Sequence, residues 1–246
     1  MNPALNNFTV LESVHGKFIV NRHCSFQAEA LVKTGRTHIE DELAKLLTIA
    51  RVLPENSVVI DAGANIGLVC IPLAHEIKAR GGIVHAFEIQ RMLFHALCGS
   101  VALNDLENVY VHHQALGSIP GWVNLVNPDY GTPQDFGTCS LLDPPSGNIY
   151  EIVQLTTIDS LNLRRLDLLK IDVEGMEPAV LLGSRESIQR FSPWCWIEYW
   201  KTGIDVIKAA FANENYRFFP MDALNLLCAP AAKLAASGIT IAGYEA

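Results

Sequence analysis

Residues 58–67 have the sequence VVIDAGANIG, and this stretch decides the fold. Its leading apolar residues predict a buried strand that ends at Asp61, and the loop through Asn65 leads into a helix that reaches about Lys78. A strand, a glycine loop and a helix in this order are typical of a parallel sheet that binds its ligand beyond the carboxyl ends of the strands. Gly63 permits a close backbone approach to a ligand, and Gly67 permits close packing of the helix on the sheet.

Short apolar segments alternate with amphipathic ones along most of the chain. The other expected strands are 83–87, 109–112, 168–173, 194–199, 217–219 and 239–241, and the expected helices between them are 91–103, 178–190 and 204–212. This alternation predicts an α/β fold of the Rossmann-like type, with a mostly parallel sheet and helices on both of its faces.

The N-terminal part has a pattern of its own. Two alternating segments, 8–11 and 17–20, predict a small hairpin. Thr37 and Glu40 have the spacing of a capping box, which predicts a helix at about 38–51. The expected domains are residues 1–55, a hairpin and helix packed on the core, and residues 56–246, the main domain, with an insertion of turns and short strands at about 117–150.

Composition and charge exclude several classes of protein. The chain has 246 residues, a formal net charge of −8 and six scattered cysteines without a C-x-x-C pair. The acidic balance argues against a nucleic-acid partner, because such partners need a basic surface, and the cysteine spacing predicts neither disulfides nor a zinc site. No basic and apolar leader opens the sequence and no stretch is apolar enough to cross a bilayer. We therefore expect a soluble, cytoplasmic protein without a membrane partner.

Acidic residues end two consecutive predicted strands beside the glycine loop, at Asp61 and Glu88. The dinucleotide fingerprint G-x-G-x-x-G needs a glycine where this chain has Asn65, so a pyrophosphate fits poorly. S-adenosylmethionine carries no phosphate, and carboxylates can hold its amino group and ribose by charge-assisted hydrogen bonds. The loop therefore predicts S-adenosylmethionine as the cofactor, with Glu88 at the ribose diol.

The sequence resembles the FkbM-type methyltransferases. The resemblance is carried, in the same order, by residues 58–67, by Ala86-Phe87-Glu88 and by LKIDVEGME at 169–177, with shorter similarities at 103–109, 115–118, 156–161 and 196–198. It covers about residues 56–200. It implies a seven-stranded sheet and the transfer of a methyl group to a hydroxyl of a sugar or secondary metabolite, and it leaves the acceptor unnamed.

The resemblance also implies cofactor contacts outside the glycine loop. Asn104 lies in one matched segment and Gln114 directly precedes another, while Glu40 or Glu42 matches a glutamate-bearing segment ahead of the first strand. The full set of expected cofactor-binding residues is Glu40, Asp61, Gly63, Asn65, Gly67, Glu88, Asn104, Gln114 and Asp172.

The catalytic residues are expected where the strand at 168–173 ends. Asp172 and Glu174 would point to one side of that strand, so we assign Asp172 to the acceptor or base role and Glu174 to its support. Glu198, on the next strand, is a further acceptor-site candidate. Alignment of the reacting atoms is worth an effective molarity of about 10⁵–10⁸ M, and a general base contributes about 10²–10⁴-fold.

Three alternatives stay open from the residues alone. Asp172 with Glu174 also suits a divalent cation, whereas His112 and His113 would point to opposite faces of a strand and make a poor metal pair. An NAD-dependent oxidoreductase uses a similar loop and acidic ribose partner, and a non-catalytic binding protein can keep the same fold. The oligomeric state, a homo-oligomer included, is not determined by the sequence.

Overall fold

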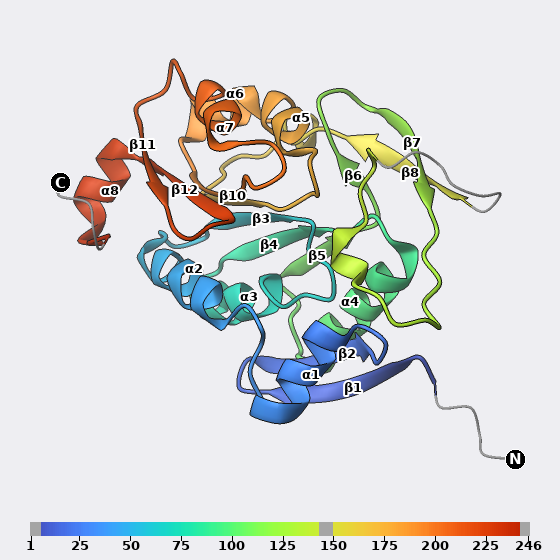
Figure 1. Cartoon of the computed structure of the whole chain (residues 1–246). Coiled ribbons are helices and arrows are strands. Elements are labelled where there is room, and N and C mark those ends of the chain that lie inside the picture. The colour runs from blue at the N-terminus through green and yellow to red at the C-terminus, as the bar shows by residue number, and fades with distance from the viewer. Residues whose placement is uncertain (1–5, 143–149, 242–246) are drawn as a thin grey trace, which may run out of the picture.

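A seven-stranded sheet forms the centre of the computed structural model, which describes residues 6–142 and 150–241 (Figure 1). Its strands are β3 (Val58–Ala62), β4 (Ile83–Phe87), β5 (Val109–His112), β9 (Leu168–Ile171), β10 (Trp194–Glu198), β11 (Tyr216–Pro220) and β12 (Asn225–Pro230). They lie in the order β11-β12-β10-β9-β3-β4-β5, and β12 alone runs in the opposite direction to the other six. The carboxyl ends of the parallel strands therefore meet at one edge, and the predicted Rossmann-like fold is confirmed.

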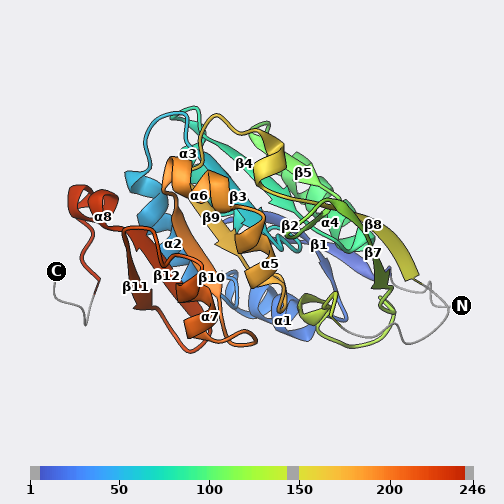
Figure 2. The ribbon, with the colours of Figure 1, turned by 90° about the horizontal axis from the view of Figure 1, so that it is seen from above.

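Helices cover both faces of this sheet, as Figures 1 and 2 show. One face carries α2 (Glu40–Val52), α3 (Cys70–Lys78) and α4 (Arg91–Leu103), and the other carries α5 (Glu177–Leu182), α6 (Arg185–Phe191) and α7 (Ile204–Ala209). Two clusters of buried apolar side chains fill the two layers. A further helix, α8 (Ala231–Ser237), lies at the β11 end of the sheet.

The predicted N-terminal hairpin is present as β1 (Phe8–Ser13) and β2 (Gly16–Asn21). It packs on α4, where the Ile19 N–H donates to the Ser100 hydroxyl at 2.9 Å and Phe18 and Val20 are fully buried. The sequence analysis missed a helix that follows it, α1 (Ser25–Thr34). Gly35, in the left-handed conformation directly after this helix, is the sequence signal that marks its end.

A second sheet consists of β6 (Ala115–Leu116), β7 (Gly121–Val126) and β8 (Tyr150–Thr156) in the order β6-β8-β7, and the region predicted as an insertion supplies β7 and the start of β8. It lies on the β5 side of the main sheet, away from α8, in both Figures 1 and 2. Two 3₁₀ turns, η1 (Phe136–Thr138) and η2 (Asp159–Leu161), flank β8 in the sequence. The part of the predicted insertion at 143–149 lies outside the described residues.

The helix predicted at 178–190 is divided into α5 and α6 by Gly183 and Ser184. A Cβ on Gly183 would overlap the backbone carbonyl oxygen of Gly117, which directly follows β6. This close approach joins the helical layer to the second sheet, and it explains why a glycine interrupts an otherwise helical pattern.

The last strand of the main sheet was wrongly predicted at 239–241, where the described residues have no regular structure. The strand at this place in the fold is β12, whose residues 225–230 read NLLCAP and are all buried. Asparagine, alanine and proline are depleted in strands, and the position of β12 between β10 and β11 outweighs this local preference.

No helix within the described ranges is both long and apolar enough to cross a membrane. The division into residues 1–55 and 56–246 stays a prediction, although Phe18, Val20 and Leu31 of the N-terminal part share one apolar cluster with β3 and β4.

We predict that Gly183→Ala destabilises the protein by about 1–3 kcal/mol, because the added methyl group forces two backbone segments apart. Gly121→Ala is the matched control, since a Cβ there has no neighbour within 4 Å, and its effect should stay within about 0.5 kcal/mol. Urea unfolding followed by circular dichroism measures both variants. Equal stabilities of the two variants would contradict the packing role of Gly183.

Candidate active site

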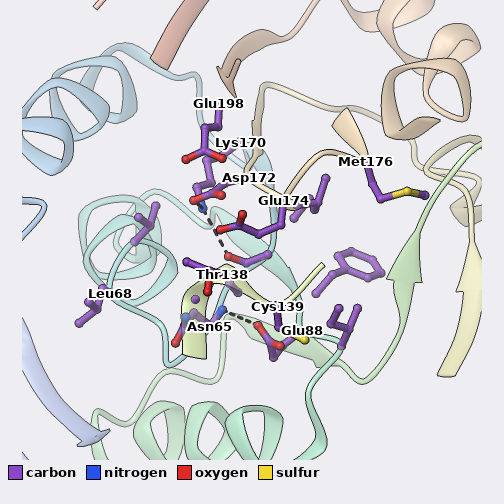
Figure 3. A pocket seen from close by; sticks show the side chains of 18 of the residues that line it. Asn65, Leu68, Glu88, Thr138, Cys139, Lys170, Asp172, Glu174, Met176 and Glu198 are labelled. Atoms are coloured by element: carbon purple, nitrogen blue, oxygen red, sulfur yellow. Dashed lines mark hydrogen bonds and ion pairs between the residues drawn. The ribbon is translucent and has the colours of Figure 1, made fainter. Parts of the chain in front are cut away.

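A cavity of about 490 Å³ opens beyond the carboxyl ends of the parallel strands. Figure 3 shows Asn65 and Glu88 at one end of it, and Lys170, Asp172, Glu174 and Glu198 together at the other. We call these the loop end and the carboxylate end. The cavity lies where an open α/β sheet ordinarily binds its ligand.

The glycine loop forms the floor of the loop end. Gly63 has a φ of +82°, and a Cβ on it would overlap the carbonyl oxygen of Asp172. The N–H groups of Gly63 and Ala64 both donate to the carbonyl of Phe87, at 3.0 and 2.9 Å. Asn65 also has a positive φ, of 51°, a conformation that asparagine tolerates better than most residues. The loop is thus held against the ends of both β4 and β9.

Glu88 is buried directly after β4 and lines the loop end. Its two carboxylate oxygens accept hydrogen bonds from the N–H groups of Asn65, at 2.8 Å, and Gln90, at 2.7 Å. Burial raises the pKa of Glu88 to about 7, although these N–H donors oppose the shift. Each oxygen keeps a lone pair for a ligand hydroxyl, as the predicted ribose contact requires.

The carboxylate end holds three acids, each with one carboxylate oxygen within 4.8 Å of an oxygen of the other two: Asp172, Glu174 and Glu198. β9 ends at Ile171, one residue before Asp172, so the predicted alternation along a strand does not bring Asp172 and Glu174 together. A turn does, in which Glu174 and Gly175 have φ values of 57° and 102°. The buried carboxylate of Glu177 accepts from the N–H of Gly175 and holds this turn.

The three acids differ in their partners. Asp172 faces the ammonium of Lys170 at 3.3 Å, and Glu174 pairs with Lys201. The Oε2 atom of Glu198 is buried and has no hydrogen-bond partner among the described residues. Burial, reinforced by the charges of Asp172 and Glu174, raises the pKa of Glu198 to about 8.

Lys170 lines the cavity and was not among the expected site residues. It lies in the middle of β9 with a side chain only 4% exposed, and its ammonium lies 3.4 Å from Asp61, 3.3 Å from Asp172 and 3.4 Å from the carbonyl of Gly63. A lysine inside an apolar strand was the signal, because a buried charge has to be paired.

The expectation for Glu40 needs correction. Glu40 pairs with His15 and Arg36, both at 2.8 Å, and does not line the cavity, whereas Glu42 does. Residues two positions apart on a helix point to nearly opposite sides, so only one of them can face the site. Burial raises the pKa of Glu42 to about 7.

The other expected residues fall into three groups. Gly63, Asn65, Glu88, Gln114, Asp172, Glu174 and Glu198 line the cavity. Asp61 and Gly67 lie beneath it, Asp61 fully buried and Gly67 packed against Ile71 and Leu97. Asn104 does not line the cavity. Its side-chain amide accepts from the N–H of Lys17 and donates to the carbonyl of Lys17, which fastens the hairpin to α4.

The part of the cavity lining that lies over the glycine loop, which we call the roof, was not predicted in detail. Gln27 of α1 and His38 reach it from the N-terminal part, and Gly137, Thr138 and Cys139 reach it from the segment at η1. Gln27 donates to the side chain of Asn65 at 3.3 Å, so segments from distant parts of the sequence close over the glycine loop.

Residues 61–218 match the family described as the methyltransferase FkbM domain, and no curated protein matches the chain. The crystal structure of methyltransferase FkbM from Methylobacillus flagellatus KT has 18% sequence identity and a TM-score of 0.53, over 72% of this chain and 44% of that one. The chain thus spans less than half the length of that protein.

Two further solved structures match the chain with TM-scores below 0.5. A putative rRNA-methylase from Clostridium thermocellum is 9% identical over 76% of this chain and 93% of that one, with a TM-score of 0.49. The M. jannaschii TYW2 structure with AdoMet is 15% identical over 92% and 85%, with a TM-score of 0.46. The family match extends over more than half of the sequence and includes the glycine loop, β9 and the carboxylate end, so this chain belongs to the FkbM methyltransferase family.

Proposed function

We propose that the protein is an S-adenosylmethionine-dependent methyltransferase that methylates a hydroxyl oxygen of a small sugar or secondary metabolite. The observation that carries this proposal is one cavity that joins a glycine loop and a ribose-competent carboxylate, Glu88, to a cluster of three acids. Membership of the FkbM family supports the same reaction.

The loop end suits S-adenosylmethionine, which when bound supplies the methyl group and a sulfonium leaving group. Glu88 would accept from the ribose diol, while Asn65 and Gln114 would border the nucleoside. The ammonium and sulfonium groups of S-adenosylmethionine are positively charged, and the carboxylates of Asp61, beneath the loop, and Glu42, across the cavity, would attract them. Carboxylates in a half-enclosed site interact with such cations more strongly than they would in water.

Glu198 is the residue we assign as general base, in preference to Asp172. Asp172 is paired with Lys170, and Glu174 is paired with Lys201. The Oε2 atom of Glu198 has no such partner among the described residues and would take the hydroxyl proton. Its pKa of about 8 lies near a working pH, where a base combines adequate strength with adequate ionisation. Asp172 would then orient the acceptor.

A small, uncharged acceptor fits this cavity better than a nucleic acid. Acids far outnumber bases along its lining, and the net charge of the chain is −8. Trp200, 52% exposed beside Glu198, offers an aromatic face on which a sugar ring can pack. We propose a reaction without a metal, because two lysines already act as counter-cations to the acidic cluster.

The NAD-dependent alternative loses support from the loop. A pyrophosphate is ordinarily held by the N-terminus of the helix that follows the glycine loop. Here α3 begins at Cys70, seven residues after Gly63, and Asn65 occupies the position of the second glycine.

We predict that the protein binds S-adenosylmethionine and S-adenosylhomocysteine in calorimetric titrations and does not bind the oxidised nicotinamide dinucleotide. Glu88→Gln should weaken binding by about 10- to 100-fold, because a hydrogen bond to a charged group is worth about 1.5–3 kcal/mol. Glu40→Gln, a matched change outside the cavity, should leave the affinity unchanged. Binding of the dinucleotide alone would overturn the proposed function.

We predict that methyl transfer to a hydroxylated acceptor rises about tenfold per pH unit below the Glu198 pKa of about 8 and levels off above it, because the base must be ionised. Glu198→Gln should remove this limb of the profile and lower kcat by about 10²–10⁴-fold. The exposed carboxylate of Glu186 on α6 provides the control Glu186→Gln, which should leave the profile unchanged. A retained acidic limb in Glu198→Gln would assign the base to another residue.

A further inference from the structure

Lys170 does not itself take the proton in the transfer proposed above, yet it carries a charge in the middle of an apolar strand. Its neighbours Leu168, Leu169 and Ile171 are fully buried, and Lys170 is itself only 4% exposed. Its ammonium makes three polar contacts at 3.3–3.4 Å, with Asp61, with Asp172 and with the carbonyl of Gly63. These contacts reach both β3 with its loop and the turn after β9.

Four acids from four elements surround this ammonium. Asp61 comes from β3, Asp172 from the turn after β9, Glu42 from α2 and Glu198 from β10, and the charges of all four interact with that of Lys170. Among the described residues that line the cavity, Lys170 is the sole lysine or arginine. The loop end and the carboxylate end therefore share one cation.

We propose that Lys170 is a positioning residue that serves as the common counter-cation of the loop end and the carboxylate end, so that one charge network holds both the methyl donor and the acceptor. This inference rests on the proposed function. Lys170 fixes the backbone of the loop through Gly63 and directs the carboxylate of Asp172, which is 37% exposed, into the cavity.

The charges show how this network operates. Burial lowers the pKa of Lys170, but Asp61, Asp172 and Glu42 outweigh burial and raise it, so the ammonium stays protonated. Burial raises the pKa of Glu42 to about 7 and that of Glu198 to about 8, and in both cases Lys170 opposes the rise. Without Lys170 these acids would keep their protons to higher pH, and the site would lose negative charge near neutrality.

The test measures the affinities for S-adenosylmethionine and S-adenosylhomocysteine by calorimetry, from about two pH units below neutrality to about one above it. In Lys170→Met the midpoint at which affinity falls on acidification should move to higher pH by about one unit or more, since a cation within about 4–6 Å lowers a carboxylate pKa by about 1–3 units. Lys170→Arg keeps the charge and should keep the midpoint.

Lys233→Met is the matched control, because Lys233 is a half-buried lysine that donates to the carbonyl of Phe191, outside the cavity. Lys233→Met should leave the midpoint unchanged. If Lys170 had only a structural role, Lys170→Met would also leave the midpoint unchanged, because methionine has a similar length.

A folded Lys170→Met variant with the wild-type midpoint overturns the inference. If that variant does not fold, the double variant Asp61→Asn with Lys170→Met removes the buried charge left unpaired. The upward shift should persist in it, because Asp172, Glu42 and Glu198 still lack the cation, and an unshifted midpoint again overturns the inference. Failure of the wild-type protein to bind either ligand would instead overturn the proposed function, and this inference with it.

Discussion

The architecture of the site depends on the close approach between the backbone of the glycine loop and the end of β9. Gly63 has no Cβ, and its φ of +82° lets the loop turn directly over the carbonyl of Asp172. β3 and β9 are paired neighbours, and this contact determines how closely the loop lies over the end of β9. Because the loop is so close, the ammonium of a residue within β9 can reach the carbonyl of Gly63.

A cation buried among acids is costly to desolvate, and its interactions recover this cost only with good geometry. Lys170 meets that condition through Asp61 on one side and Asp172 on the other. A fixed lysine thus offsets part of the acidic charge before any ligand enters. The Oε2 atom of Glu198 has no partner among the described residues, and burial raises the pKa of this carboxyl. The proposed reaction requires a group that can exchange a proton at this position.

Much of the fold was predictable because local pattern and tertiary position agree. The strands β3, β4, β5, β9 and β10 are short apolar runs, and each ends close to where the sequence places its end. β12 was missed because its neighbours in the sheet rather than propensity determine it. α1 was missed although its residues SFQAEALVKT are mostly good helix formers and Gly35 marks its end. Of the site, the acids at strand ends were found, since topology alone brings such ends together.

The rest of the site depends on information that spacing does not contain. The choice between Glu40 and Glu42 depends on how α2 is rotated, and the meeting of Asp172 with Glu174 depends on a left-handed turn. Gln114 was placed by resemblance to a family, and so was Asn104, which serves the hairpin instead. Lys170 was visible in the sequence as an anomaly, but its three partners became evident only from the fold.

The roof of the cavity joins segments that are far apart in the chain. Gln27 contacts Asn65, and the N–H of Gln134 donates to the carbonyl of His23. Contacts over such sequence separations form slowly, because a long loop must close before they stabilise anything. During synthesis the first forty residues therefore leave the ribosome long before their partners near residue 135. The cavity can be completed only after residues near 135 have been made, because residues 137–139 line it together with Gln27 and His38 of the N-terminal part.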